Sequence, residues 1–201
     1  GSEMCIRDSE YSASNWKQFV DNHNDYEDWF EIYNASGASI DLVGYYLSDD
    51  DDVLNKWVFP AGSVIESGGF LKIWCSGRNV VDAGNYHTNF KLTQTKNSPD
   101  QIILSNNALV IEDSTTMVFT LTHHSRSRFT NGSAEWKICT APTPGLSNNG
   151  STMYAAYTDR PAMSVAGGFY PAAIKVGLVT TTVDGVIHYT CLLYTSDAAD
   201  E

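Results

Sequence analysis

The fold is decided by one stretch of the sequence, Asp28-Trp29-Phe30-Glu31-Ile32-Tyr33-Asn34. Successive side chains of a β-strand point to opposite faces, so Phe30 and Ile32 share one face, which we assign to a core. Glu31 lies on the opposite face, beside two aromatic residues. The turn Ala35-Ser36-Gly37 ends this strand, and a second apolar run follows it. Most of the remaining chain repeats this order of strand, turn and strand.

This repetition predicts an all-β chain, because turn residues interrupt short apolar runs throughout. Within residues 101–111, Asn106-Asn107 separates two apolar runs and predicts a hairpin with a two-residue turn. We expect residues 76–86 to be a loop and residues 126–132 to be a basic loop. Strands are expected at residues 10–13, 28–34, 40–42, 45–47, 56–60, 70–75, 87–92, 101–105, 108–111, 117–121 and 134–139.

Composition narrows the class of protein. The chain has 201 residues, of which 42% are hydrophobic and 12% aromatic, and this is enough to bury a core. No apolar run reaches the ~18 residues of a membrane-spanning helix, so we expect no membrane span. The formal net charge is −12 and no basic stripe is present, so we expect no nucleic-acid partner.

Both ends of the sequence look foreign to the fold. Gly1-Ser2 is typical of a tag, and Met4-Cys5-Ile6-Arg7-Asp8-Ser9 resembles the translated sequencing adapters that contaminate metagenomic assemblies. Residues 191–201 resemble the same kind of artefact. We therefore assign residues 1–8 and 191–201 to artefacts, residues 9–148 to a first domain, residues 149–160 to a linker and residues 161–190 to a partial second domain.

Two cysteines remain once the ends are set aside, Cys75 and Cys139. Their separation fits no metal site. A disulfide between them is one expectation for an exported protein, and two buried free thiols are the other.

The order of the elements in the first domain resembles the lamin-tail domain in its bacterial form. The resemblance covers roughly Ser9 to Asn148 and implies an immunoglobulin-like β-sandwich. Lamin-tail domains are not enzymes; they are interaction modules of nuclear lamins and, in bacteria, are appended to secreted or surface proteins. The matching residues are Ser9 to Asn15, Asp28 to Asn34, Ile40 to Leu42, Gly44 to Asp50, Lys56 to Pro60, Gly68 to Trp74, His87 to Leu92, Arg128 to Gly132, Trp136 and Thr143 to Gly145.

The C-terminal part resembles the first half of the small β-sandwich at the end of chitobiases and β-hexosaminidases. The matching residues are Pro161 to Ser164, Gly168 to Tyr170 and Ile187 to Thr190. Half a sandwich leaves an apolar face open around Val176, Leu178 and Ile187. We expect that face to pack on the first domain or on a second copy. The second alternative predicts a homo-oligomer formed through the incomplete C-terminal sheet.

Two groups of residues are candidates for ligand binding. The acidic run Asp49, Asp50, Asp51 and Asp52 offers oxygen ligands to calcium, but it lacks the spacing of an EF-hand, and a solvated turn is the simpler interpretation. Trp16, Tyr45 and Tyr46 are candidates for stacking on a sugar, although core packing is the general explanation for aromatic residues in strands.

Other polar residues carry weaker signals. His87, His123 and His124 lack the spacing of a metal site, and we expect them on the surface or hydrogen-bonded in strands. Arg126, Arg128 and Lys137 form a small basic group that fits an acidic partner or a solvated loop. No Gly-x-Ser-x-Gly motif supports a hydrolase triad.

These observations predict a non-catalytic interaction or adhesion module of a secreted or cell-surface bacterial protein with several domains. Its partner would be a protein or a glycan at the cell surface. A carbohydrate-binding module is the alternative, and a hydrolase is a distant third. Glu31 is expected to hold a loop, so that Glu31→Gln would lower stability and leave ligand affinity intact.

Overall fold

The computed structural model describes residues 6–95 and 99–189. Close contacts divide the chain into two units, residues 1–155 and residues 156–201. All regular elements of the described residues are β-strands, as predicted. None of these residues forms a helix of the length and apolarity that crossing a bilayer requires.

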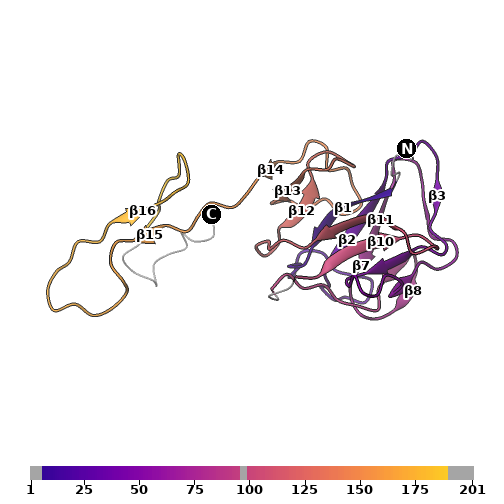
Figure 1. Cartoon of the computed structure of the whole chain (residues 1–201). Coiled ribbons are helices and arrows are strands. Elements are labelled where there is room, and N and C mark those ends of the chain that lie inside the picture. Colours follow the sequence, from indigo (N-terminus) through magenta and orange to yellow (C-terminus); the bar gives the residue numbers. More distant parts are fainter. Residues whose placement is uncertain (1–5, 96–98, 190–201) are drawn as a thin grey trace. The chain divides into compact units, whose positions relative to one another are not determined.

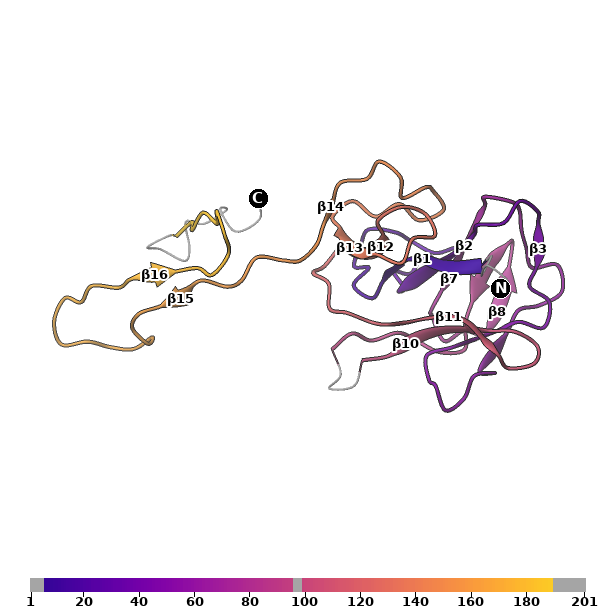
Figure 2. The same cartoon turned by 45° about the horizontal axis from the view of Figure 1, so that its top comes forward.

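The first unit contains two larger sheets, seen as two layers in Figure 2. One sheet has eight strands in the order β14-β13-β12-β1-β2-β7-β9-β8, and the other has four in the order β11-β10-β4-β5. Figure 1 labels β1, β2 and β7 of the larger sheet and β10 and β11 of the smaller one. The eight strands are β1 (Ile6–Ser12), β2 (Trp29–Asn34), β7 (Phe70–Trp74), β8 (Val80–Asp82), β9 (Asn85–His87), β12 (Ser125–Arg128), β13 (Trp136–Cys139) and β14 (Met153–Tyr154). The four are β4 (Tyr46–Ser48), β5 (Trp57–Val58), β10 (Gln101–Ser105) and β11 (Ile111–Thr116), and β3 (Ile40–Asp41) pairs with β6 (Val64–Ile65).

The hydrophobic core joins the inner faces of the two sheets. Phe30 and Ile32 of β2 are buried in it as predicted, together with Ile73 of β7. Leu47 of β4 and Leu104 of β10 belong to the same cluster and come from the four-stranded sheet. Two sheets that share one apolar layer form a β-sandwich.

The opposite face of β2 is also buried, although it carries a carboxylate as well as an aromatic side chain. Trp29 and Glu31 are 0% exposed. The ring of Phe19, from the loop after β1, meets the Trp29 ring edge-on with centroids 5.9 Å apart. Gly145, from the loop after β13, donates its N–H to Glu31. Strand β2 is therefore buried on both sides.

The first strand begins earlier than predicted. We expected residues 1–8 to lie outside the domain, yet Ile6, Arg7 and Asp8 pair with residues of β2. Asp8 is buried and pairs with Arg128 of β12, whose Nη2 also lies 2.9 Å from Asp113 Oδ2. A charge buried with its partners belongs to the folded domain, so Ile6 to Asp8 are part of it.

Several predicted strand boundaries are wrong. Strand β8 lies inside the expected loop 76–86, and β12 lies inside the expected basic loop 126–132. Residues 117–121 are not a strand, because β11 precedes them and β10 pairs with Ile111 to Thr116 across a longer turn. The strand expected at 87–92 stops at His87, where β9 pairs in parallel with β7.

The second unit contains one small sheet, in which β15 (Ala162–Met163) pairs with β16 (Leu178–Val179). Residues 168–170 and 187–189, which carry the resemblance to a small β-sandwich, are not regular elements. The first unit also extends past residue 148, because β14 adds to β13 within the expected linker 149–160. The segment 191–201, which we assigned to an artefact, lies outside the described residues.

The core position of Ile32 gives a direct test of the fold. Ile32→Ala removes three buried carbons and leaves a cavity between the sheets, so we expect a loss of about 2–5 kcal/mol in the free energy of unfolding. Chemical denaturation followed by tryptophan fluorescence measures this. Val118→Ala, at a site 49% exposed, is the control and should change stability by no more than about 0.5 kcal/mol. Equal effects of the two substitutions would contradict the assignment of the core.

Candidate functional site

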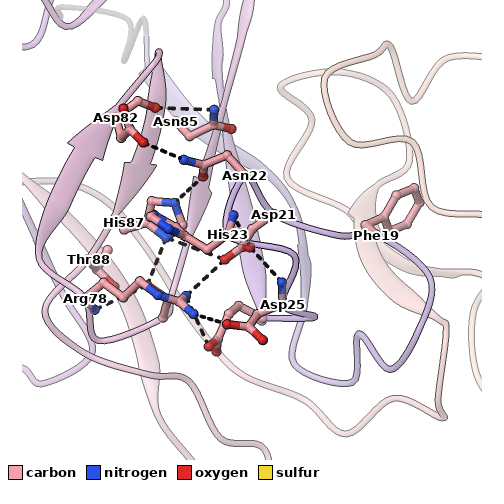
Figure 3. Close-up of polar contacts among 12 residues, drawn as sticks. Phe19, Asp21, Asn22, His23, Asp25, Arg78, Asp82, Asn85, His87 and Thr88 are labelled. Atoms are coloured by element: carbon pink, nitrogen blue, oxygen red, sulfur yellow. Dashed lines mark hydrogen bonds and ion pairs between the residues drawn. The ribbon is translucent and has the colours of Figure 1, made fainter.

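The densest group of charged side chains holds the loop after β1 against the strands around β9 (Figure 3). Arg78 stands at its centre: Nη1 lies 3.0 Å from Asp21 Oδ2 and 3.4 Å from Glu27 Oε1, and Nη2 pairs with Asp25. Lys91 Nζ lies 2.9 Å from Glu27 Oε2 and extends the network. One cation with three acidic partners from a single loop makes an effective clamp.

His87 of β9 lies beside this clamp and is fully buried. Its Nε2 lies 2.8 Å from Asn22 Oδ1, and its Nδ1 lies 3.0 Å from Ser76 Oγ. The amide nitrogen of Asn22 donates to Asp82, so Asn22 Oδ1 is the acceptor and His87 Nε2 carries the proton. Burial lowers the pKa of His87, which favours this neutral form.

Ser76, His87 and Asn22 have the order of a nucleophile, a base and an orienting group. Ser76 is only 5% exposed, and its Oγ also accepts the Arg78 N–H at 3.3 Å. A serine nucleophile must reach the carbonyl carbon that it attacks. The arrangement therefore serves to fix the loop. Of the two positions that we expected for His87, on the surface or hydrogen-bonded in a strand, the structure shows the second.

Two buried carboxylates face each other across β1 and β2, because Glu10 is opposite Glu31 in the register after a bulge. Both hold the loop after β13. Glu10 Oε2 accepts the Thr143 N–H at 3.1 Å and the Thr143 hydroxyl at 3.0 Å, and Glu31 accepts the Gly145 N–H. The expectation that Glu31 holds a loop agrees with this contact. Burial raises the pKa of Glu10 and raises that of Glu31 to about 8.

The basic group is not a binding surface of three free cations. Arg128 is buried, donates to the Asp8 carbonyl at 2.6 Å and lies over the Trp136 ring at 4.7 Å. Lys137 Nζ lies 3.4 Å from the Phe129 ring centroid and 3.3 Å from Glu135 Oε1. Arg126 is half-buried, on the strand next to β1. The contacts of Arg128 and Lys137 are therefore within the domain.

His123 lies in a turn and is exposed, in agreement with the expected surface position, and His124 follows it at a half-buried position before β12. His123 pairs with the Trp16 carbonyl, and its own N–H donates to the Ser14 carbonyl at 3.2 Å. The His124 carbonyl accepts the Ser12 hydroxyl at 3.0 Å. This turn is thus tied to the loop after β1.

The three candidate aromatic residues lie in different settings. Trp16 lies in the loop after β1, is 64% exposed and has Lys17 Nζ 5.1 Å from its ring. Tyr45 packs against the hydrophobic core, and Tyr46 lies in β4 between its partners Val58 and Ser105. The structure leaves the indole of Trp16 open to a ligand and places the two tyrosines in the four-stranded sheet and its core.

The acidic run forms the turn between β4 and β5. Asp50, Asp51 and Asp52 each offer an oxygen within 4.8 Å of the others, whereas Asp49 pairs with Lys56 at 2.5 Å. Asp50 Oδ1 also accepts the Asp52 N–H at 3.0 Å. Three carboxylate oxygens are fewer than the six to eight ligands that calcium takes, so calcium binding stays a prediction.

Cys75 and Cys139 are free and buried, so the expected disulfide is not formed and the alternative of two buried thiols holds. Cys139 Sγ donates to the Ala141 carbonyl at 3.1 Å. Burial raises the pKa of both thiols, which makes them unreactive at neutral pH.

Sequence reasoning missed three residues that organise the site, namely Arg78, Glu10 and Asp21. Arg78 is the only cation of residues 76–86, which was a signal that it has an acidic partner. Glu10 lies opposite Glu31 because the register of β1 and β2 shifts at a bulge between Asp8 and Glu10. No local pattern in the sequence indicates that bulge.

The two sheets and the strand order of the first unit can be compared with known families. Residues 8–136 match the family model described as Lamin Tail Domain. This chain belongs to the lamin tail domain family. No curated protein matches the sequence. The resemblance that we saw in the first domain is confirmed, whereas the second unit lies outside the matched residues.

The raised pKa of Glu31 predicts how the stability of this lamin tail domain varies with pH. The native carboxyl keeps its proton up to about pH 8, whereas the unfolded carboxyl loses it near 4.5, so Glu31 stabilises most at low pH. This stability is lost as pH rises through about 8. We expect the free energy of unfolding to fall by on the order of 2 kcal/mol between about pH 5 and about pH 8.

Glu31→Gln should flatten this pH profile, because the amide is neutral and keeps an oxygen for the Gly145 N–H. We therefore revise the loss of stability expected from the sequence: at pH 7 the free energy of unfolding of this variant should be close to that of the unsubstituted chain. Denaturation at several pH values measures both curves. Glu135→Gln, at an exposed carboxylate, is the control and should follow the unsubstituted chain. A Glu31→Gln profile with the original slope would contradict the pKa argument.

Arg78→Met tests whether the clamp fixes the loop. Methionine keeps an apolar stem and removes the guanidinium, which leaves the buried Asp21 without its cation. We expect a loss of about 1–3 kcal/mol, because Arg78 is partly solvated, and faster amide hydrogen exchange over residues 21–27. Lys17→Met, at an exposed cation of the same loop, is the control. Unchanged exchange in Arg78→Met would show that other contacts hold the loop.

Proposed function

We propose that this lamin tail domain is a non-catalytic interaction or adhesion module of a secreted or cell-surface bacterial protein with several domains. One observation carries the proposal: side chains of the kinds that do chemistry are buried and bonded to the chain's own loops. Ser76 and His87 bond to each other, Glu31 holds Gly145, and Arg128 is enclosed by carboxylates. Polar groups used in this way are unavailable to a substrate.

A protein partner is favoured by the apolar side chains that remain exposed on the first unit. Val110, Ile111 and Phe119 are exposed just before, at the start of and after β11, which is an edge strand of the four-stranded sheet. Edge strands with exposed apolar side chains are surfaces where other proteins bind. The secreted or surface location rests on the bacterial relatives that the sequence resembles and on the acidic charge of the chain.

A carbohydrate-binding module is the second candidate, and the exposure of Trp16 supports it. An exposed indole offers a flat face to the C–H groups of a sugar. The partial resemblance of residues 161–190 to the end of chitobiases is in keeping with this candidate. For that second unit we also propose self-association, since β15 and β16 pair only with each other among the described residues and Val176 and Leu178 are exposed.

Binding of the fluorescently labelled chain to fixed bacterial cells tests the proposal. We expect binding that protease treatment of the cells abolishes and that periodate, which cleaves sugar diols, leaves intact. Binding sensitive to periodate and lost in Trp16→Ala, but kept in the control Phe169→Ala at another exposed aromatic residue, would favour the carbohydrate candidate. Hydrolysis of chromogenic ester or glycoside substrates that Ser76→Ala abolishes would overturn the non-catalytic assignment.

A further inference from the structure

Two free sheet edges border one groove on the first unit. Strand β5 ends the four-stranded sheet and β8 ends the eight-stranded sheet. The groove between them has a volume of about 180 Å³. It is lined by Trp57, Val58, Pro60, Asn79, Val80 and Val81. Its apolar lining stays accessible, since Val58 is 50% exposed and Val80 is 37% exposed.

The backbones of both edge strands present hydrogen-bonding groups away from their own sheets. Phe59 donates its N–H to the Tyr45 carbonyl, on the β4 side. Backbone groups alternate in an antiparallel ladder, so the N–H and C=O of Val58 point away from β4. Asn79 likewise donates to the Thr88 carbonyl beyond β9, so the backbone groups of Val80 point away from β9.

Contacts beneath the groove fix the spacing of its two walls. Asn89 Nδ2 donates to the Lys56 carbonyl at 2.7 Å and links the segment after β9 to the start of β5. The Phe59 ring lies 5.0 Å from the Trp57 ring and 6.5 Å from the Tyr86 ring. A preformed groove lowers the entropic cost of binding.

A second, acidic hollow is lined by Lys56, one residue before Trp57 and two residues before Val58 of the groove. Asp49, Asp50, Asp51 and Asp100 supply its charge. Among the described residues of its lining, Lys56 is the only cation, and it pairs with Asp49. The hollow therefore keeps a net negative charge and favours a cationic group.

We infer that the groove between β5 and β8 binds an extended segment of a partner protein by strand addition. An apolar side chain of the segment fills the groove, and a lysine or arginine one or two residues along meets the acidic hollow. The rise of ~3.3 Å per residue in a strand suits two subsites whose lining residues are one or two positions apart. The acidic hollow selects a partner segment that carries a basic residue, and this charge complementarity identifies the occupant of the groove. This inference rests on the proposed role as an interaction module and names its partner.

A phage-displayed library of random dodecapeptides, selected on the full chain, tests the inference. We expect the selected peptides to share an apolar or β-branched residue followed within two positions by Lys or Arg. Resynthesised with a fluorophore, they should bind Val80→Asp at least about tenfold more weakly, because a charge enters the apolar groove. Val118→Asp, at a similarly exposed valine outside the groove lining, should bind like the unsubstituted chain.

Two further variants separate the parts of the site. Val58→Lys places a charge on the opposite wall of the groove and should weaken binding as Val80→Asp does. Because the two substitutions lie on different strands, weaker binding by both would not result from the misfolding of one variant. The double variant Asp50→Asn, Asp51→Asn should weaken binding about threefold to tenfold at low salt, with a smaller effect at about 0.5 M NaCl because ions screen the charges. Circular dichroism confirms that each variant is folded.

Peptides that bind all the variants equally well would overturn the groove assignment while leaving the interaction module standing. Failure to select any peptide would also overturn the groove assignment, and the proposed function would then depend on the cell-binding experiment alone. Selected peptides without a basic residue would overturn the assignment of the acidic hollow.

Discussion

Strand β2 must be covered on both faces, and the rest of the first unit depends on this requirement. Trp29, Phe30, Glu31 and Ile32 are consecutive and each is at most 1% exposed. The four-stranded sheet covers Phe30 and Ile32 with apolar side chains. On the other face, Trp29 and Glu31 are covered by the loop after β1 and the loop after β13.

A loop that covers a sheet must satisfy its own backbone, since buried polar groups without partners cost free energy. The chain solves this with side chains placed under the loops. Glu10 and Glu31 accept N–H groups from the loop after β13, while Asn15 Oδ1 accepts the Phe19 N–H in the loop after β1. The concentration of ionisable residues is thus explained by loop attachment.

The sequence predicted those features that follow from local alternation. Phe30 and Ile32 were assigned to the core, and Trp136–Cys139 was recognised as a strand, because both show a pattern within a few residues. Features that depend on distant partners were not predicted. Strand β8 is short and exposed and is defined by its pairing with β9, and Arg128 was assigned to a loop because nothing near it reveals Asp8.

The candidate sites also differ in whether the local sequence or distant partners define them. The acidic turn could be predicted from its local sequence, since it needs no tertiary partner, whereas no sequence pattern separated the exposed Trp16 from Tyr45, which packs against the core. The groove between β5 and β8 could not be predicted, because it joins the edges of two sheets. The cysteines were undecided for a related reason: a disulfide depends on the distance between strands, which no sequence pattern gives.

The pairing of Arg128 with Asp8 joins residues 120 positions apart. It has a practical consequence for where the domain is cut. The family match begins at residue 8, whereas β1 begins at Ile6. A shortened protein beginning at Ser9 would bury a guanidinium that has lost a carboxylate and a carbonyl acceptor. When a relative is expressed, the protein should begin upstream of the residue that pairs with the arginine equivalent to Arg128, even where the recognisable motif starts later.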